Sequence, residues 1–217
     1  PTRRKVATTR KRVAAKKPLI MIGRVSSARA DWDARVKLAE RVGANVLTDI
    51  KTGASFPTAH ALHPFPPSLY VTDEAGVLVR EADVIVSLDW IDLGGTLRQA
   101  CKGALPKARV FQCSLDQYVH NGWSMDYQAL PPTDLTVLAS PDRLVDRLIE
   151  ALGPGTPPAR APYPGRGEEV GPAVVDGRLS VQAMARQITD GLAKHNPSYI
   201  RLPLGWPGSC CRFADPR

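Results

Sequence analysis

The sequence predicts an α/β protein in which helices flank a parallel β-sheet, and three observations predict it. Short apolar runs, typical of strands buried on both faces, recur along the first two thirds of the chain. Stretches with helical spacing separate these runs, so the strands need crossover connections and run parallel. A segment rich in proline and glycine follows, and beyond it lies one more stretch with helical spacing.

Five apolar runs are the expected strands. The first ends at Gly23, and the third has the sequence ADVIVSL, which is the pattern most typical of a central parallel strand. The loop between the second and third, at 51–67, is rich in Gly, Pro and His and has no period, so we expect it to be functional. The runs are residues 18–23, 45–47, 82–88, 109–115 and 135–138.

The first expected helix follows the first strand. Asp31 is the expected N-cap and Gly43 the expected end of this helix. Arg35, Lys37 and Glu40 fall largely off the apolar stripe. The stripe consists of Trp32, Val36, Ala39 and Val42.

Residues 77–81 are expected to form the end of a second helix. Another helix is expected to begin at Ser140, where a capping hydroxyl, a proline and an acid follow one another. Ser180 caps a third helix of this kind, and a short basic helix is expected at 6–15. Residues 199–202 are expected to begin a strand. The buried stripe of the last capped helix would be Val181, Met184, Ala185, Ile188 and Leu192.

The net charge of +8 comes from one terminal segment. Eight cations and no acid lie between Arg3 and Lys17, and without them 21 basic residues face 21 acidic ones. A neutral globular part argues against a folded nucleic-acid-binding face. Four cysteines without paired spacing favour a reducing compartment, and no apolar run is long enough to cross a bilayer. We therefore expect a cytoplasmic protein.

The order of these motifs resembles a known family. PLIMIGR, the loop KTGASFPTAHALH, the strand ADVIVSLD and VFQCSLDQ follow one another as "rPliliG", "GkgafpedHply", "aDlvlalG" and "vihvDiDp" do in the middle domain of the acetolactate synthase and benzoylformate decarboxylase superfamily. The resemblance covers about residues 6–152. It implies a Rossmann-like (DHS-like) sheet and a thiamine-diphosphate-dependent parent enzyme that acts on 2-keto acids.

The resemblance also implies a division of the chain. Residues 1–152 would form the middle domain, 153–177 a linker, and 178–206 the start of the diphosphate-binding domain. Residues 207–217 are an unassigned tail, either out of frame, truncated or naturally divergent. In the family, thiamine diphosphate and Mg²⁺ bind to domains outside this region, so we assign no catalytic residue and no metal ligand. The expected partners are the enzyme's other domains, in a homodimer or homotetramer.

Candidate ligand-binding residues follow the expected strands, at the edge where open parallel sheets bind ligands. They are Gly23, Arg24, Thr48, Asp89 and Asp116. Some relatives bind FAD or ADP here, but a phosphate cradle needs more glycine than Gly23 alone. Ser114, in place of the first acid of "DiD", also disfavours a flavin.

Other conspicuous residues receive structural interpretations. His60 and His63 lack further metal ligands at suitable spacing, and Gly94 with Gly95 is too isolated for a phosphate loop. We expect the aromatic side chains to pack at domain or subunit contacts rather than to stack on nucleic-acid bases. These aromatic residues are Trp90, Trp123 and Tyr127.

Two alternatives to the fragment of a thiamine-dependent enzyme stay open. The chain could be a stand-alone Rossmann-like protein that binds NAD or FAD. It could instead bind nucleic acid through the basic arm from Arg3 to Lys17.

Overall fold

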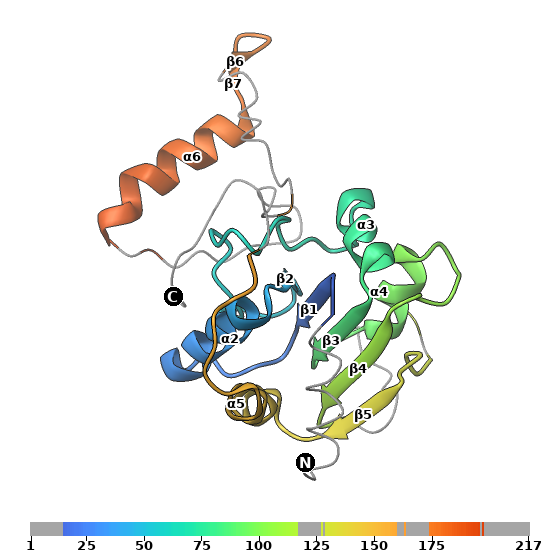
Figure 1. Cartoon of the computed structure of the whole chain (residues 1–217). Helices are drawn as coiled ribbons and strands as arrows, with labels where there is room; N and C mark the ends of the chain where they lie inside the picture. The colour runs from blue at the N-terminus through green and yellow to red at the C-terminus, as the bar shows by residue number, and fades with distance from the viewer. Residues whose placement is uncertain are drawn as a thin grey trace.

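The computed structural model describes residues 15–116, 127, 129–159, 163, 174–195 and 197. A five-stranded sheet lies at its centre, with the order β2-β1-β3-β4-β5 and every neighbouring pair parallel (Figure 1). The expected α/β fold with a parallel sheet is confirmed. The strands are β1 (Pro18–Ile22), β2 (Asn45–Thr48), β3 (Val84–Leu88), β4 (Arg109–Ser114) and β5 (Leu135–Leu138).

Helices cover both faces of the sheet (Figure 1). On one face α2 (Arg29–Val42) packs beside α5 (Pro141–Leu152), and on the other α3 (Asp73–Glu81) packs beside α4 (Leu93–Ala100). All residues of β1 and β3 are buried, as expected for central strands between two helical layers.

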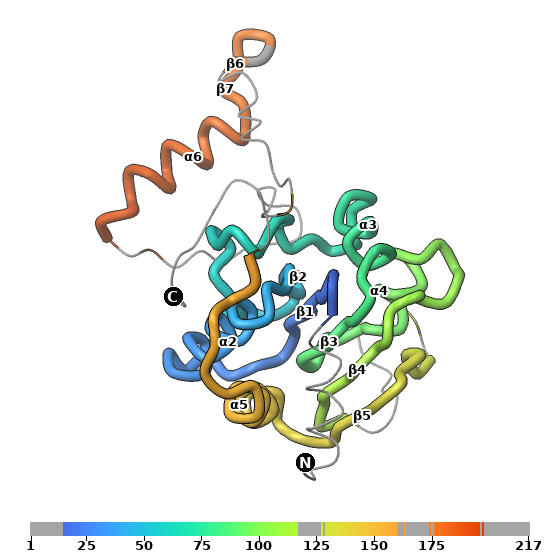
Figure 2. The backbone as a smooth tube through the Cα atoms, in the orientation of Figure 1, coloured from blue at the N-terminus to red at the C-terminus, as the bar shows by residue number. Residues whose placement is uncertain are grey.

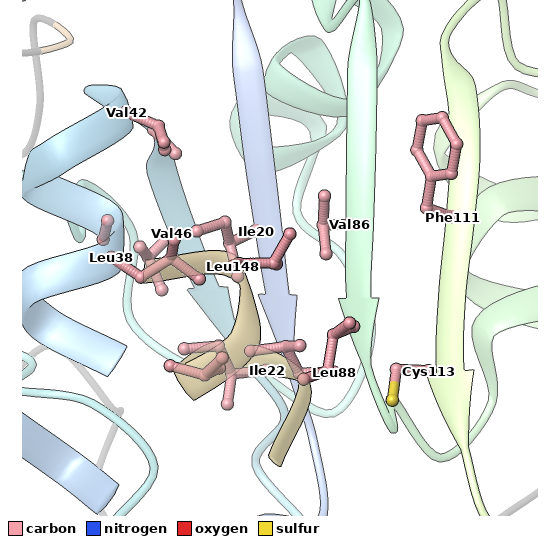
Figure 3. Close-up of a cluster of buried hydrophobic side chains, with 14 of the residues drawn as sticks. Ile20, Ile22, Leu38, Val42, Val46, Val86, Leu88, Phe111, Cys113 and Leu148 are labelled. Atoms are coloured by element: carbon pink, nitrogen blue, oxygen red, sulfur yellow. The ribbon is translucent and has the colours of Figure 1, made fainter. Parts of the chain in front are cut away.

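The core on the α2/α5 face joins strand residues to helix residues (Figure 3). Ile20 and Val86 point from β1 and β3 toward Leu38 of α2 and Leu148 of α5, and all four side chains are buried. Packing of this kind, rather than helix propensity, supplies most of the stability of short helices.

Helix α4 was not expected from the sequence. Its N-cap, Asp92, accepts a hydrogen bond from the amide of Gly95, and the helix buries residues at helical spacing. Two glycines in its first turn weaken the helical signal, because glycine disfavours a helix by about 1 kcal/mol relative to alanine. The buried residues are Leu93, Gly94, Leu97 and Ala100.

The expected helix ends are confirmed in part. Gly43 adopts the left-handed conformation with φ 61° and ends α2, and the Ser180 hydroxyl accepts a hydrogen bond from the amide of Ala183. The expectation that Asp31 caps α2 is wrong, because the helix begins two residues earlier and Asp31 lies in its first turn. Ser140 is the N-cap of α5, but its side chain makes no capping hydrogen bond.

Arg35, expected to lie largely off the apolar stripe of α2, belongs to the buried face of this helix. Its side chain is fully buried, and it forms an ion pair of 2.5 Å with Asp142 of α5. It also donates hydrogen bonds of 2.9 Å to the carbonyl oxygens of Ser26 and Ser55. The guanidinium has enough donors to satisfy all these acceptors at once, which makes its burial tolerable.

The C-terminal elements lie apart from the sheet (Figure 2). They are β6 (Val174–Val175) and β7 (Arg178–Leu179), which are antiparallel, followed by α6 (Val181–Leu192) and the short η1 (Ala193–His195). Helix α6 is confirmed, but three residues of its expected buried stripe are exposed: Val181, Ile188 and Leu192. The expected basic helix at 6–15 lies outside the described residues except for Ala15, and the expected strand at 199–202 and the tail 207–217 lie wholly outside them.

Replacing Arg35 by leucine is expected to lower the free energy of unfolding by about 3–5 kcal/mol, because the carboxylate of Asp142 would stay buried without its partner. Urea denaturation followed by circular dichroism measures this change. Arg29→Leu, on the exposed surface of the same helix, is the control and should cost about 1 kcal/mol or less. Equal losses for the two variants would contradict the role given to Arg35.

Burial raises the pKa of the Cys113 thiol to about 12, and this side chain is fully buried. Because the thiolate is the reactive form, Cys113 should resist iodoacetamide at pH 8.5 in the folded chain and react in concentrated urea. Peptide mass spectrometry measures the labelling. Above about pH 8.5 the thiol ionises in the unfolded chain, near its ordinary pKa, but stays neutral in the folded chain. This residue's contribution to the free energy of unfolding therefore declines above about pH 8.5. Rapid labelling of folded Cys113 would refute both statements.

Candidate functional site at the carboxyl edge of the sheet

The order in which successive strands are added to the sheet reverses between β1 and β3. From β1 it continues to β2 on one side, and β3 lies on the other, so the carboxyl ends of β1 and β3 form the topological switch point. Open α/β sheets bind their ligands at such a point. Gly23 and Arg24 follow β1, and Asp89 follows β3, so three of the five candidate residues lie there.

Gly23 lets the two strand ends approach each other. A Cβ atom at this position would lie 2.1 Å from the carbonyl oxygen of Asp89, which no side chain tolerates. The amide of Gly23 donates to the carbonyl of Leu88, and the amide of Arg24 donates to the carbonyl of Asp89, each at 2.9 Å. The space that glycine leaves is therefore filled by the backbone of the neighbouring strand.

Asp89 is the centre of a polar network. It adopts φ 57°, a left-handed conformation unusual for a residue with a side chain. Its carboxylate accepts hydrogen bonds from the hydroxyl of Ser114 at 2.6 Å and from the guanidinium of Arg24 at 2.9 Å. Arg24 also forms an ion pair with Asp116, whose amide donates to the Ser114 hydroxyl. The structure thus brings together four of the five candidates.

Among the described residues, the network places two carboxylates around one guanidinium. Burial lowers the pKa of Arg24, but its hydrogen bonds to Asp116 and Asp89 outweigh burial and raise the pKa above its ordinary value. A phosphate at this point would have to displace both acids and would face their charge. The residues present do not fit a nucleotide diphosphate at the Gly23 turn.

Thr48, the fifth candidate, belongs to a different group of contacts. Its hydroxyl lies 2.9 Å from Nε2 of the buried His63, and Phe56 stacks on the same imidazole ring. The carbonyl of Leu62 accepts a hydrogen bond of 2.7 Å from the amide of Val46 in β2. The loop at 51–67 therefore contacts β2 through Leu62 and His63.

A groove at the carboxyl edge of the sheet was not predicted from the sequence. It has a volume of about 530 Å³ and lies between α4 and residues 68–71, with Trp90 and Tyr127 among its lining residues. The pair Gly94–Gly95 was the only feature singled out in the sequence that could have indicated this groove. A Cβ at Gly94 would touch the ring of Tyr127, and one at Gly95 would overlap the carboxylate of Asp92.

No group of three or more His, Cys, Asp or Glu side chains that could hold a metal ion occurs among the described residues. None of the helices in the described part of the chain is long and apolar enough to cross a membrane.

Comparison of the fold with solved structures finds thiamine diphosphate-dependent enzymes. The 4-hydroxybenzoylformate decarboxylase of Rhodococcus jostii RHA1 aligns with 88% of this chain at a TM-score of 0.56 and 16% identity. The benzoylformate decarboxylase of Polynucleobacter necessarius aligns with 92% at a TM-score of 0.57 and 18% identity. An enzyme from Mycobacterium smegmatis assigned as thiamin diphosphate-dependent aligns with 88% at a TM-score of 0.57 and 21% identity.

This chain spans about a third of those proteins, 34% of the first and 35% of the other two. No protein-family model and no curated protein matches the sequence. The likeness expected from the sequence motifs is therefore confirmed at the level of the fold, which is a Rossmann-like α/β fold shared with part of each enzyme.

If the two acids keep phosphate away from the switch point, removing their charge should admit it. We expect the double variant Asp89→Asn, Asp116→Asn to bind inorganic pyrophosphate at least about tenfold more tightly than the original chain, because Arg24 then meets no competing carboxylate. Isothermal titration calorimetry measures the affinity. Adding Arg24→Gln to the double variant should abolish the gain, and a gain that survives this third change would contradict the assignment.

Proposed function

We propose that this chain is the middle domain, with short flanks, of a larger thiamine-diphosphate-dependent enzyme that decarboxylates or ligates 2-keto acids. The fold alignment supports this proposal most directly, because it covers almost the whole chain and about a third of each neighbour. A chain about one third as long as these neighbours fits one domain of a three-domain enzyme. Two of the neighbours are a benzoylformate decarboxylase and a 4-hydroxybenzoylformate decarboxylase, which supports a 2-keto acid as the substrate class.

In such an enzyme thiamine diphosphate, held through Mg²⁺, supplies the electron sink for decarboxylation. The resemblance places the groups that hold thiamine diphosphate and Mg²⁺ on the other domains of the enzyme, so the contribution of this chain would be structural. The sheet and its two helical layers would hold the two thiamine-binding domains in a fixed orientation within a cytoplasmic homodimer or homotetramer.

Nucleotide binding at the switch point, the main alternative, is disfavoured by the site itself. The Gly23 turn is filled by the backbone of Asp89, and Arg24 is paired with two acids. The second alternative, nucleic-acid binding through Arg3 to Lys17, rests on a segment of which only residues 15–17 are described, and it stays a prediction.

The proposal predicts that the chain alone lacks activity. Incubated with thiamine diphosphate, Mg²⁺ and benzoylformate, it should release no CO₂ above the rate without protein, because the groups that hold the cofactor belong to other domains. Translation of the genomic DNA on both sides should reveal a glutamate-bearing pyrimidine domain and a GDG-type motif. Turnover by the isolated chain, or flanking DNA without either motif, would refute the proposed function.

A further inference from the structure

The groove beside α4 has a wall that is held in place by hydrogen bonds. The side-chain amide of Gln99, on α4, accepts from the amide of Val71 and donates to the carbonyl of the same residue, both at 3.3 Å. This pairing fastens residues 68–71 to α4. Two large apolar side chains of that segment, Leu69 and Tyr70, stay 58% and 59% exposed at the groove.

Two aromatic side chains, Trp90 and Tyr127, also line the groove, and contacts hold both in place. The indole N–H of Trp90 donates a hydrogen bond of 2.8 Å to the hydroxyl of Thr96. Asp92 caps α4 through one carboxylate oxygen, and its other oxygen accepts from the amide of Tyr127 at 3.2 Å. Gly94 leaves room for the ring of Tyr127. The two glycines in the first turn of α4 therefore shape this part of the groove lining.

The acidic and basic side chains that line the groove differ in how far they are buried. Among the described lining residues, the two carboxylates, Asp49 and Asp92, are only 4% and 5% exposed, and each accepts a hydrogen bond from a backbone amide. The three cations of the described lining, Lys51, Arg98 and Lys102, are all exposed. Arg98 lies over the ring of Tyr127 at 5.1 Å from its centroid, which keeps the cation beside this aromatic side chain. The accessible charge of the described lining is therefore positive.

We propose that this groove binds a small ligand that combines a flat apolar ring with one anionic group, such as an aromatic carboxylate. The ring would lie against the aromatic and apolar walls, and the anion would meet the exposed cations around Lys102 and Arg98. A volume of about 530 Å³ lies within the range of small-molecule sites. Arg24, Asp89 and Asp116 are not among the described residues that line this groove, and the proposal does not depend on the function proposed above.

Three naphthalene probes with the same ring test the proposal on the full chain: 2-naphthoate, 2-naphthyl phosphate and the uncharged 2-naphthamide. Fluorescence titration at low salt should give a dissociation constant for 2-naphthoate at least about tenfold below that for 2-naphthamide. Lys102→Gln should weaken 2-naphthoate by about threefold or more and leave 2-naphthamide unchanged. Lys107→Gln, an exposed lysine outside the groove lining, is the matched control and should change neither.

The phosphate probe identifies the preferred anion. Tighter binding of 2-naphthyl phosphate with the same dependence on Lys102 would support the site and assign a phosphate to it, whereas weaker binding would assign a carboxylate. Equal affinity for 2-naphthoate and 2-naphthamide would overturn the proposal, as would absence of saturable binding. Equal losses in the Lys102 and Lys107 variants would also overturn it, because they would indicate attraction by net charge alone. Circular dichroism establishes that each variant is folded.

Discussion

The buried ion pair between Arg35 and Asp142 is the interaction on which the other features of this domain depend. Its guanidinium, inside the layer formed by α2 and α5, holds the carbonyl oxygens of Ser26 and Ser55, while the second carboxylate oxygen of Asp142 accepts the amide of Ser26. One pair of side chains thereby positions the loop after β1, the loop along the edge of β2 and the start of α5. An ion pair of this kind stabilises the fold only because further hydrogen bonds satisfy both partners.

The same pair determines what the carboxyl edge of the sheet can do. Because the loop after β1 is held at Ser26, Arg24 lies within reach of Asp89 and Asp116 and is neutralised by them. The switch point, where open α/β sheets commonly bind ligands, is thus closed by the chain's own side chains. A groove of ligand size lies along α4, and the exposed charged residues of its described lining are cations. This separation supports a mainly structural role for the sheet and a distinct ligand site beside it.

Much of the fold followed from the sequence because buried strands and amphipathic helices leave periodic signals. All five strands, α5 and the glycine that ends α2 were predicted, since each depends on residues close together in the chain. Arg35 was misplaced because its partner lies 107 residues away, and charge alone suggests exposure. Helix α4 was missed because Gly94 and Gly95 resemble a loop, although their absent side chains make room for Tyr127 and Asp92. The expected sheet topology located the candidate residues at the strand ends. Their mutual neutralisation could not be predicted, because it depends on distances in space and not on spacing along the sequence.

The central claim is that the chain closes its own switch point against nucleotides. The most direct measurement is a two-dimensional ¹⁵N NMR titration of the chain with ADP, with the backbone amides of Gly23, Arg24 and Asp89 as reporters. The account predicts that these three amides keep their chemical shifts at saturating ADP, whatever happens to resonances along the α4 groove. Saturable shifts of Gly23 and Arg24 would contradict it and would show that a diphosphate displaces the two acids.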